Sequence, residues 1–185
     1  MLDRDRIAPE EVRPLRRLEF DRLTELGAFE DERLELLHGV IVAMGPQTPR
    51  HAEVLDELNI FLVPALQGRA RVRVRGPFAA DDSEPQPDLA VIFPGKHWRE
   101  HPASAFLIIE VTDGDGHKER DVKRSLYANA GVVEYWIFDV HSETLEAHRS
   151  PENGGYRDVW RFQRGDSVAL AAFPDVILQV ADFLP

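Results

Sequence analysis

Two acidic residues border apolar stretches of this sequence in a pattern that suits catalysis. Asp88 follows Pro87 and opens the run Leu89-Ala-Val-Ile92, and Glu110 closes the run Phe106-Leu-Ile-Ile-Glu110. Carboxylates at the ends of buried strands are costly unless they are paired with a cation or bind one. A divalent ion between them would offset that cost and act as an electrophile. The pattern therefore indicates metal-assisted phosphodiester chemistry.

Both acids also have plainer interpretations. Asp88 alone is typical of a residue that caps the start of a strand. Glu110 is harder to explain in this way, because an unpaired carboxylate after four apolar residues is destabilising or takes up a proton. Adjacent parallel strands lie about 4.8 Å apart, so carboxylates at matching heights can share one Mg²⁺. We therefore expect Asp88 and Glu110 on adjacent strands, with carboxylates converging within roughly 4–6 Å.

A lysine and a third acid complete the candidate catalytic set. Lys123 lies on an amphipathic segment ahead of the apolar run 134–139. It is either a solvated helix lysine or a cation that stabilises charge on the reacting phosphate or orients the attacking water. Glu35 stands between Leu34 and Leu36, so strand alternation predicts an exposed side chain. The functional alternative for Glu35 is a further acid beside the metal.

Composition limits the class of protein. The chain has 185 residues, of which 43% are hydrophobic, and this fits a single domain over 1–185 with a flexible N-terminal arm over 1–13. The absence of cysteine excludes disulfides, thiolate zinc sites and cysteine nucleophiles. No signal-peptide core and no apolar run of about 18 residues is present, so we expect a cytoplasmic protein with no membrane partner. A net charge of -11 argues against non-specific coating of nucleic acid, but not against an acidic site neutralised by metal.

Hydrophobic periodicity predicts an α/β fold with a central mixed β-sheet flanked by helices. Helices are expected over 14–26, 48–67 and 117–130. Strands are expected over 70–75, 88–93, 106–111, 133–139 and 176–180, with two short strands over 34–44 and a C-terminal β-hairpin over 144–148 and 156–162. The strand, helix and strand across 106–139 imply a right-handed crossover between parallel neighbours.

One predicted strand carries a basic face. Arg69, Arg71, Arg73 and Arg75 alternate with Ala70, Val72 and Val74. Alternate residues of a strand share a face, so the arginines either follow the phosphates of a nucleic acid or form a charged edge that resists aggregation. The second interpretation is the more common one for a charged strand.

Four motifs together carry a family resemblance. They are Leu34-Glu-Leu-Leu-His-Gly-Val-Ile-Val-Ala-Met44 with His51 opening the next helix, Gln86-Pro-Asp-Leu-Ala-Val-Ile92, Leu107-Ile-Ile-Glu-Val-Thr112, and Lys123-Arg-Ser-Leu-Tyr-Ala-Asn-Ala-Gly-Val-Val-Glu-Tyr-Trp-Ile-Phe-Asp139. In this combination the chain resembles the Uma-type putative restriction endonuclease family of the PD-(D/E)XK nuclease superfamily. The resemblance implies a restriction-endonuclease-like core over 34–184.

The resemblance also implies site residues and partners. Asp88 and Glu110 would hold Mg²⁺ or Mn²⁺, Glu35 would be an accessory acid, and the substrate would be DNA cleaved by a homodimer. The superfamily's lysine normally lies two residues after the glutamate, where this chain has Thr112. In the family this lysine is thought to have moved to the following helix, where Lys123 stands. The segment Thr112-Asp-Gly-Asp-Gly116 also replaces the Ser-Pro-Ser stretch that the family often shows.

Weaker expectations concern DNA contacts and the alternatives to catalysis. His51, Arg71, Arg73 and Arg75 are candidate nucleic-acid-binding residues, although capping or packing explains His51 equally well. The leading hypothesis is a metal-dependent DNA endonuclease with Asp88, Glu110 and Lys123 at its centre. The alternatives are a catalytically silent nuclease fold that acts as a binding or regulatory module, and a small-molecule metal hydrolase.

Overall fold

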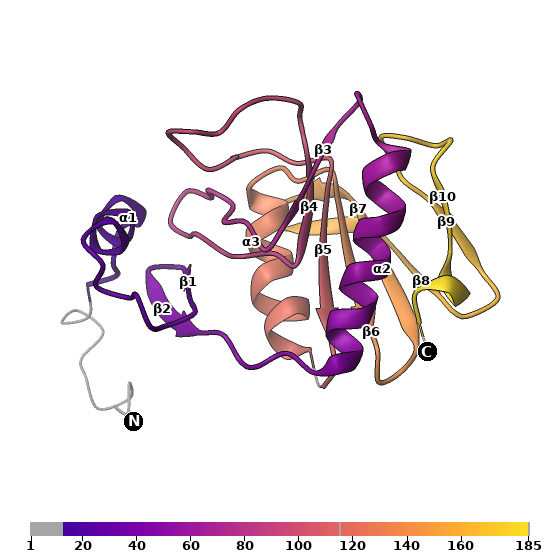
Figure 1. Cartoon of the computed structure of the whole chain (residues 1–185), viewed down its shortest axis with the longest axis horizontal. Coiled ribbons are helices and arrows are strands. Elements are labelled where there is room, and N and C mark those ends of the chain that lie inside the picture. The colour runs from indigo at the N-terminus through magenta and orange to yellow at the C-terminus, as the bar shows by residue number, and fades with distance from the viewer. Residues whose placement is uncertain (1–12, 115, 185) are drawn as a thin grey trace.

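A six-stranded sheet forms the centre of the molecule (Figure 1). The computed structural model describes residues 13–114 and 116–184, so the expected arm over 1–13 lies outside the described residues except for Arg13. The strand order is β3-β4-β5-β6-β7-β8. The bounds are Arg71–Val74 for β3, Leu89–Ile92 for β4, Leu107–Thr112 for β5, Glu134–Asp139 for β6, Thr144–Glu152 for β7 and Gly155–Phe162 for β8.

The sheet is mixed, as the sequence predicts. Strands β5 and β6 are parallel, and the crossover between them contains the helical segments η3 (Lys118–Lys123) and α3 (Arg124–Asn129). Strands β4 and β5 are antiparallel, so the assumption of parallel strands beneath Asp88 and Glu110 is wrong. The reason is the connection: no helix lies between β4 and β5, and a chain that returns without a crossover pairs antiparallel.

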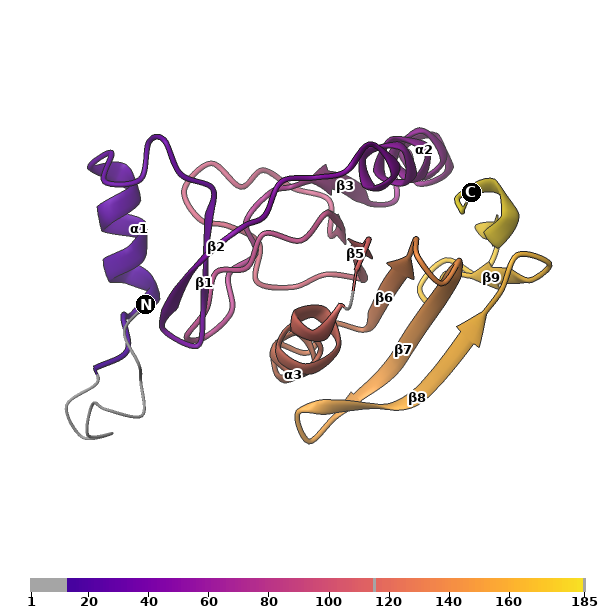
Figure 2. The ribbon, with the colours of Figure 1, turned by 90° about the horizontal axis from the view of Figure 1, so that it is seen from below.

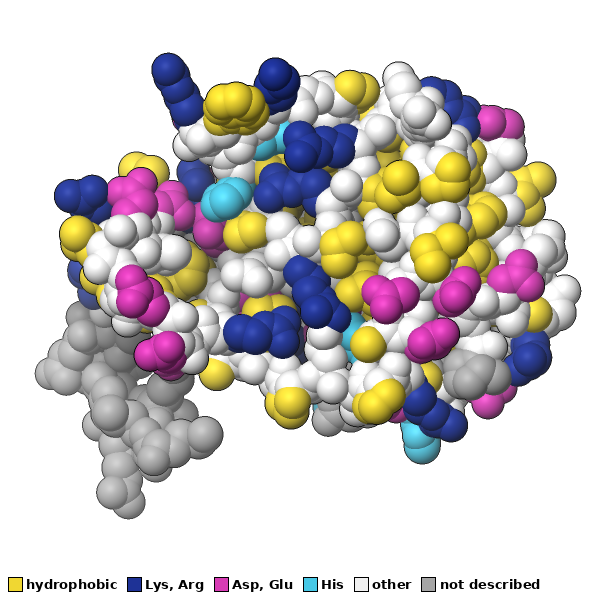
Figure 3. Space-filling model, viewed as in Figure 1, with side chains coloured by type: hydrophobic (Ala, Val, Ile, Leu, Met, Phe, Trp, Pro, Cys, Tyr) yellow, Lys and Arg dark blue, Asp and Glu magenta, His cyan; other side chains and the backbone are white. Residues whose placement is uncertain are grey.

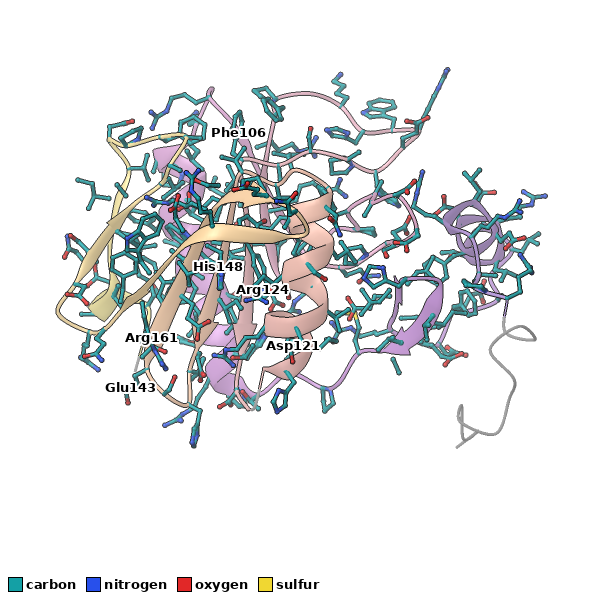
Figure 4. The ribbon with its side chains drawn as sticks, turned by 180° about the vertical axis from the view of Figure 1, so that it is seen from behind. Phe106, Asp121, Arg124, Glu143, His148 and Arg161 are labelled. Carbon is teal, nitrogen blue, oxygen red and sulfur yellow. The ribbon has the colours of Figure 1, made fainter. Side chains whose placement is uncertain are left out.

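Helices cover both faces of the sheet (Figure 2). Helix α2 (Pro49–Ala65) packs on one face through buried leucines and valines, and Thr48 caps it by accepting a hydrogen bond from the His51 backbone N–H at 3.2 Å. The segments η3 and α3 lie over the opposite face, which is nearer the viewer in Figure 4. Each face therefore has its own apolar core, and Trp136 and Tyr135 of β6 are fully buried on opposite sides.

The helix predicted over 117–130 is not a single α-helix. It begins as the π-helical segment η3 and continues as α3. The i→i+5 hydrogen bonds of a π-helix add a residue to each turn, so side chains five apart lie near one face. Lys118 and Lys123 are five apart, and both contact Glu35.

Smaller elements flank the sheet. Helix α1 (Arg17–Glu25) and the hairpin of β1 (Leu34–Leu37) and β2 (Val40–Ala43) lie beyond β3 and β4. A second two-stranded sheet joins β9 (Ser167–Ala169) to β10 (Ile177–Gln179), followed by η4 (Val180–Asp182). Strand β9 was not predicted, because three residues are too few to show alternation.

Candidate active site

The register of two adjacent strands brings Asp88 and Glu110 together. Leu89 of β4 pairs with Ile109 of β5, so the next residues along, Asp88 and Glu110, are opposite each other and point to the same face. Both line a cavity of about 260 Å³ beside the end of η3. The N-terminal end of β4 and the C-terminal end of β5 therefore meet at the cavity.

One oxygen of each carboxylate is held by the protein. Asp88 Oδ2 accepts a hydrogen bond from the Val111 backbone N–H at 2.9 Å and lies 3.0 Å from His51 Nε2. Glu110 Oε1 accepts hydrogen bonds from Lys123 Nζ and from the Tyr127 hydroxyl, both at 2.9 Å. The second oxygens, Asp88 Oδ1 and Glu110 Oε2, receive no hydrogen bond from the described residues.

Lys123 occupies the centre of this site. Its side chain is 1% exposed, and Nζ lies 2.9 Å from Glu110 Oε1 and 3.0 Å from Glu35 Oε2. Burial alone would lower the pKa of Lys123, but the carboxylates of Glu110 and Glu35 raise it above its ordinary value. The lysine is therefore a fixed, buried cation that points from the helix toward the carboxylates, and the solvated interpretation is wrong.

Glu35 is buried, contrary to the exposed position that strand alternation predicts. Its side chain is 0% exposed, and its two oxygens lie 2.8 Å from Lys118 Nζ and 3.0 Å from Lys123 Nζ. Lys118 and Lys123 of η3 contact Glu35, and all four residues of this short strand are buried. Burial would raise the pKa of Glu35, but the two lysines lower it. Glu35 thus fixes Lys123 in place.

The site carries more negative charge than its lysines neutralise. Glu35, Asp88 and Glu110 face Lys123 and the half-buried Lys118. Burial raises the pKa of Glu110 to about 8, because the attraction of Lys123 does not offset desolvation and the repulsion of Asp88 and Glu35. A cation added between Asp88 and Glu110 would remove this imbalance.

The carboxylates fit a divalent ion that keeps most of its water. Among the described residues, no group of three or more His, Asp or Glu side chains is placed to hold a metal. Mg²⁺ commonly binds through one or two carboxylates and retains several waters, so the two free oxygens meet that minimum. Two buried polar atoms of residues that line the cavity, His51 Nδ1 and Thr112 Oγ1, also lack a protein partner. They are available to bound water.

The sequence-predicted residues separate into two groups. Glu35, Asp88, Glu110, Lys123 and His51 gather at the cavity, and their chemical roles stay predictions. Arg71 and Arg73 lie along β3, outside the cavity, and Arg75 follows that strand.

Sequence reasoning missed Lys118 at this site. An α-helical reading separates Lys118 and Lys123 by about 140° at 3.6 residues per turn. Only a π-helix turns both lysines toward Glu35. No sequence signal for this π-helix is evident.

Comparison with known proteins agrees with this architecture. The fold class is nuclease-like: a structure described as a putative nuclease belonging to DUF820, from Anabaena variabilis, superposes with a TM-score of 0.76 at 17% identity, covering 92% of this chain and 97% of the other. The family model described as Uma2, putative restriction endonuclease, matches residues 18–181. The chain belongs to that family. No curated protein matches it. Among the described residues, no helix has the length and apolarity to cross a membrane.

Proposed function

We propose that this protein is a metal-dependent endonuclease that hydrolyses phosphodiester bonds in DNA. The observation that carries the proposal is the pair of carboxylates, Asp88 and Glu110, each with one oxygen fixed by the protein and one free at the same cavity. Membership of a family described as restriction endonucleases supports the reaction class.

Each residue has a distinct part in the proposed reaction. Asp88 and Glu110 would hold Mg²⁺ or Mn²⁺, and the bound ion would polarise the phosphate and lower the pKa of a water. Lys123 supplies positive charge next to Glu110, where it stabilises the charge that develops on the phosphate oxygens. Glu35 positions Lys123, and His51 orients Asp88 through their 3.0 Å contact.

Plasmid cleavage tests the proposal. Purified protein is incubated with supercoiled plasmid and Mg²⁺ or Mn²⁺, and nicked and linear products are followed on a gel. Asp88→Ala is expected to lower the rate by ~10² or more, as for loss of a group that acts in the transition state. Asp56→Ala is the matched control, because this substitution removes the same charge and Asp56 lies on the exposed face of α2. Equal rates in wild type and Asp88→Ala would show that any cleavage arises elsewhere.

A catalytically silent nuclease fold is the second candidate. The observation in its favour is Thr112, which stands at the superfamily's lysine position with a buried hydroxyl that has no protein partner. This candidate predicts that wild-type protein binds DNA and does not nick plasmid with either metal ion. Calorimetry with Mn²⁺ would then show whether the inactive protein fails to bind the metal ion or binds it without cleaving DNA.

Assembly as a homodimer belongs to the same proposal. Val159 and Trp160 support it, since β8 is an edge strand that leaves these apolar side chains 51% and 43% exposed. Light scattering should give twice the 21.0 kDa chain mass. A mass equal to one chain over the working concentration range would contradict dimerisation and leave the catalytic proposal intact.

A further inference from the structure

Two arginines of β3 lie on the face of the sheet that carries the candidate active site, and a third directly follows the strand. β3 is an edge strand, and Val72 packs into the core beneath α2. Side chains alternate along a strand, so Arg71 and Arg73 point to the other face, and Arg75 follows directly after β3. We call Arg71, Arg73 and Arg75 the arginine row.

The arginine row is not neutralised by the protein. No acidic side chain of the described residues forms an ion pair with any of the three, whereas Arg69 just before β3 lies 2.8 Å from Asp175. Arg71 donates one hydrogen bond to the Gly95 carbonyl at 3.2 Å. Buried nitrogens of the other two, Arg73 Nη1 and Arg75 Nε, have no partner. In a chain of net charge -11, this row is a local concentration of positive charge.

Partial burial makes the unpaired positive charge of Arg73 unfavourable. Burial and the nearby Arg71 lower the pKa of Arg73 below its usual value, which reflects positive charge without a counter-charge. Guanidinium groups bind phosphate through paired N–H donors, and no acidic side chain of the described residues competes for those of the row.

The arginine row leads to the carboxylates. The Arg75 backbone N–H donates to the Asp88 carbonyl at 2.9 Å, so one end of the row adjoins the residue proposed to bind metal. Alternate residues of a strand are about 6.7 Å apart, close to the axial length of two nucleotides in one DNA strand. Successive arginines can thus contact phosphates of one strand as it approaches the cavity.

An exposed aromatic residue lies beyond the other end of the row. Trp98 is 83% exposed in the loop after β4, and Lys96 Nζ lies 5.3 Å from its ring centroid. Figure 3, which is viewed from the side of α2, shows Lys and Arg side chains gathered near β3 and this loop. Exposed aromatic rings beside basic grooves stack on unpaired bases, which duplex DNA does not present.

We propose that the arginine row binds the phosphates of a single DNA strand and directs it to Asp88 and Glu110, with Trp98 stacking on an unpaired base. This inference rests on the proposed nuclease function and adds the form of its substrate. The strand is either single-stranded DNA or an unpaired segment of a duplex.

Binding without cleavage tests the proposal. A labelled single strand of 20 nucleotides and the matching duplex are titrated with protein in EDTA, and anisotropy is recorded over a series of salt concentrations. The variants are Arg71→Gln and the double variant Arg71→Gln with Arg73→Gln. The control double variant is Arg13→Gln with Arg157→Gln, because both arginines are exposed, lie away from the row and Trp98, and are already paired with acids.

The salt dependence gives the expected magnitude. Each phosphate contact on a single strand contributes about 0.7 to the slope of log K against log salt, so the double variant should lower the slope by about 1.4 and Arg71→Gln by about 0.7. The control should change neither slope nor preference for the single strand. Trp98→Ala should weaken single-strand binding with the slope unchanged.

Three outcomes would overturn the inference: equal slopes in wild type and both row variants, an equal loss in the control, or tighter binding of duplex than of single strand. Arg71→Gln keeps the test valid if the half-buried Arg73 affects folding, because Arg71 is exposed. Binding by the row without cleavage of either the single strand or the plasmid, with Mg²⁺ or Mn²⁺ added, would support the inference and contradict the endonuclease. Cleavage with unchanged slopes would do the reverse.

Discussion

Replacing Lys123 with Met is the most informative single change in this protein. Met keeps much of the apolar packing of the stem and deletes the ammonium, which is 2.9 Å from Glu110 Oε1 and 3.0 Å from Glu35 Oε2. Removing one partner of a buried ion pair costs about 3–5 kcal/mol. Lys118 remains paired with Glu35, and Glu110, whose pKa is already about 8, takes up a proton. We therefore expect a smaller loss, about 2–3 kcal/mol of unfolding free energy.

The catalytic consequence is larger than the loss of stability. Deleting one preorganised electrostatic group lowers turnover by ~10² or more, equivalent to about 2.7 kcal/mol of transition-state stabilisation. Plasmid nicking with Mg²⁺ measures turnover, and urea unfolding measures stability. Both are recorded at a temperature where the variant is folded.

A double variant separates the two effects. Adding Glu35→Gln to Lys123→Met removes the buried carboxylate that has lost one of its two lysine partners, so part of the lost stability should be recovered. Cleavage should not recover, because the ammonium beside Glu110 is still absent. Wild-type cleavage by folded Lys123→Met protein would refute the assignment of charge stabilisation to this lysine and favour the silent nuclease fold.

Further predictions concern the metal, pH and the core. His51→Ala should weaken Mn²⁺ binding by about 10–100-fold in calorimetry, because an oriented carboxylate loses its partner; unchanged affinity would remove His51 from the site. Burial and Asp21 raise the pKa of Glu84 to about 8 from 4.5, so the folded state keeps a proton that the unfolded state releases. Stability should then fall as pH rises from 4.5 to 8. Glu84→Gln should reduce that fall in thermal unfolding and leave the part caused by Glu110, whose pKa is also raised to about 8; a fall as large as in wild type would show that Glu84 does not contribute. Leu58→Ala, at a fully buried position of α2, should lower the unfolding free energy by about 3 kcal/mol and leave Mn²⁺ affinity unchanged; a changed affinity would mean that α2 couples to the site.

The sequence by itself determined the elements and the acids at their ends. Continuous apolar runs predict β4, β5 and β6 as buried strands, because only a strand covered on both faces is apolar at successive positions. The amphipathic segment between β5 and β6 predicts their parallel crossover. Asp88 and Glu110 follow as candidates, since an acid at the end of such a run requires a partner.

Tertiary structure decided how those residues are partnered. Alternation places Glu35 in solvent, yet residues more than eighty positions away bury it beneath Lys118 and Lys123. The π-helix of η3 aligns the two lysines, and the spacing of residues in the sequence does not predict it. The lack of acidic partners for Arg73 likewise depends on which chain segments lie beside β3. The spacing of residues along the sequence determines the secondary structure and the face on which each side chain lies. Burial and charge pairing depend on residues far apart in the sequence, which only the folded chain brings together.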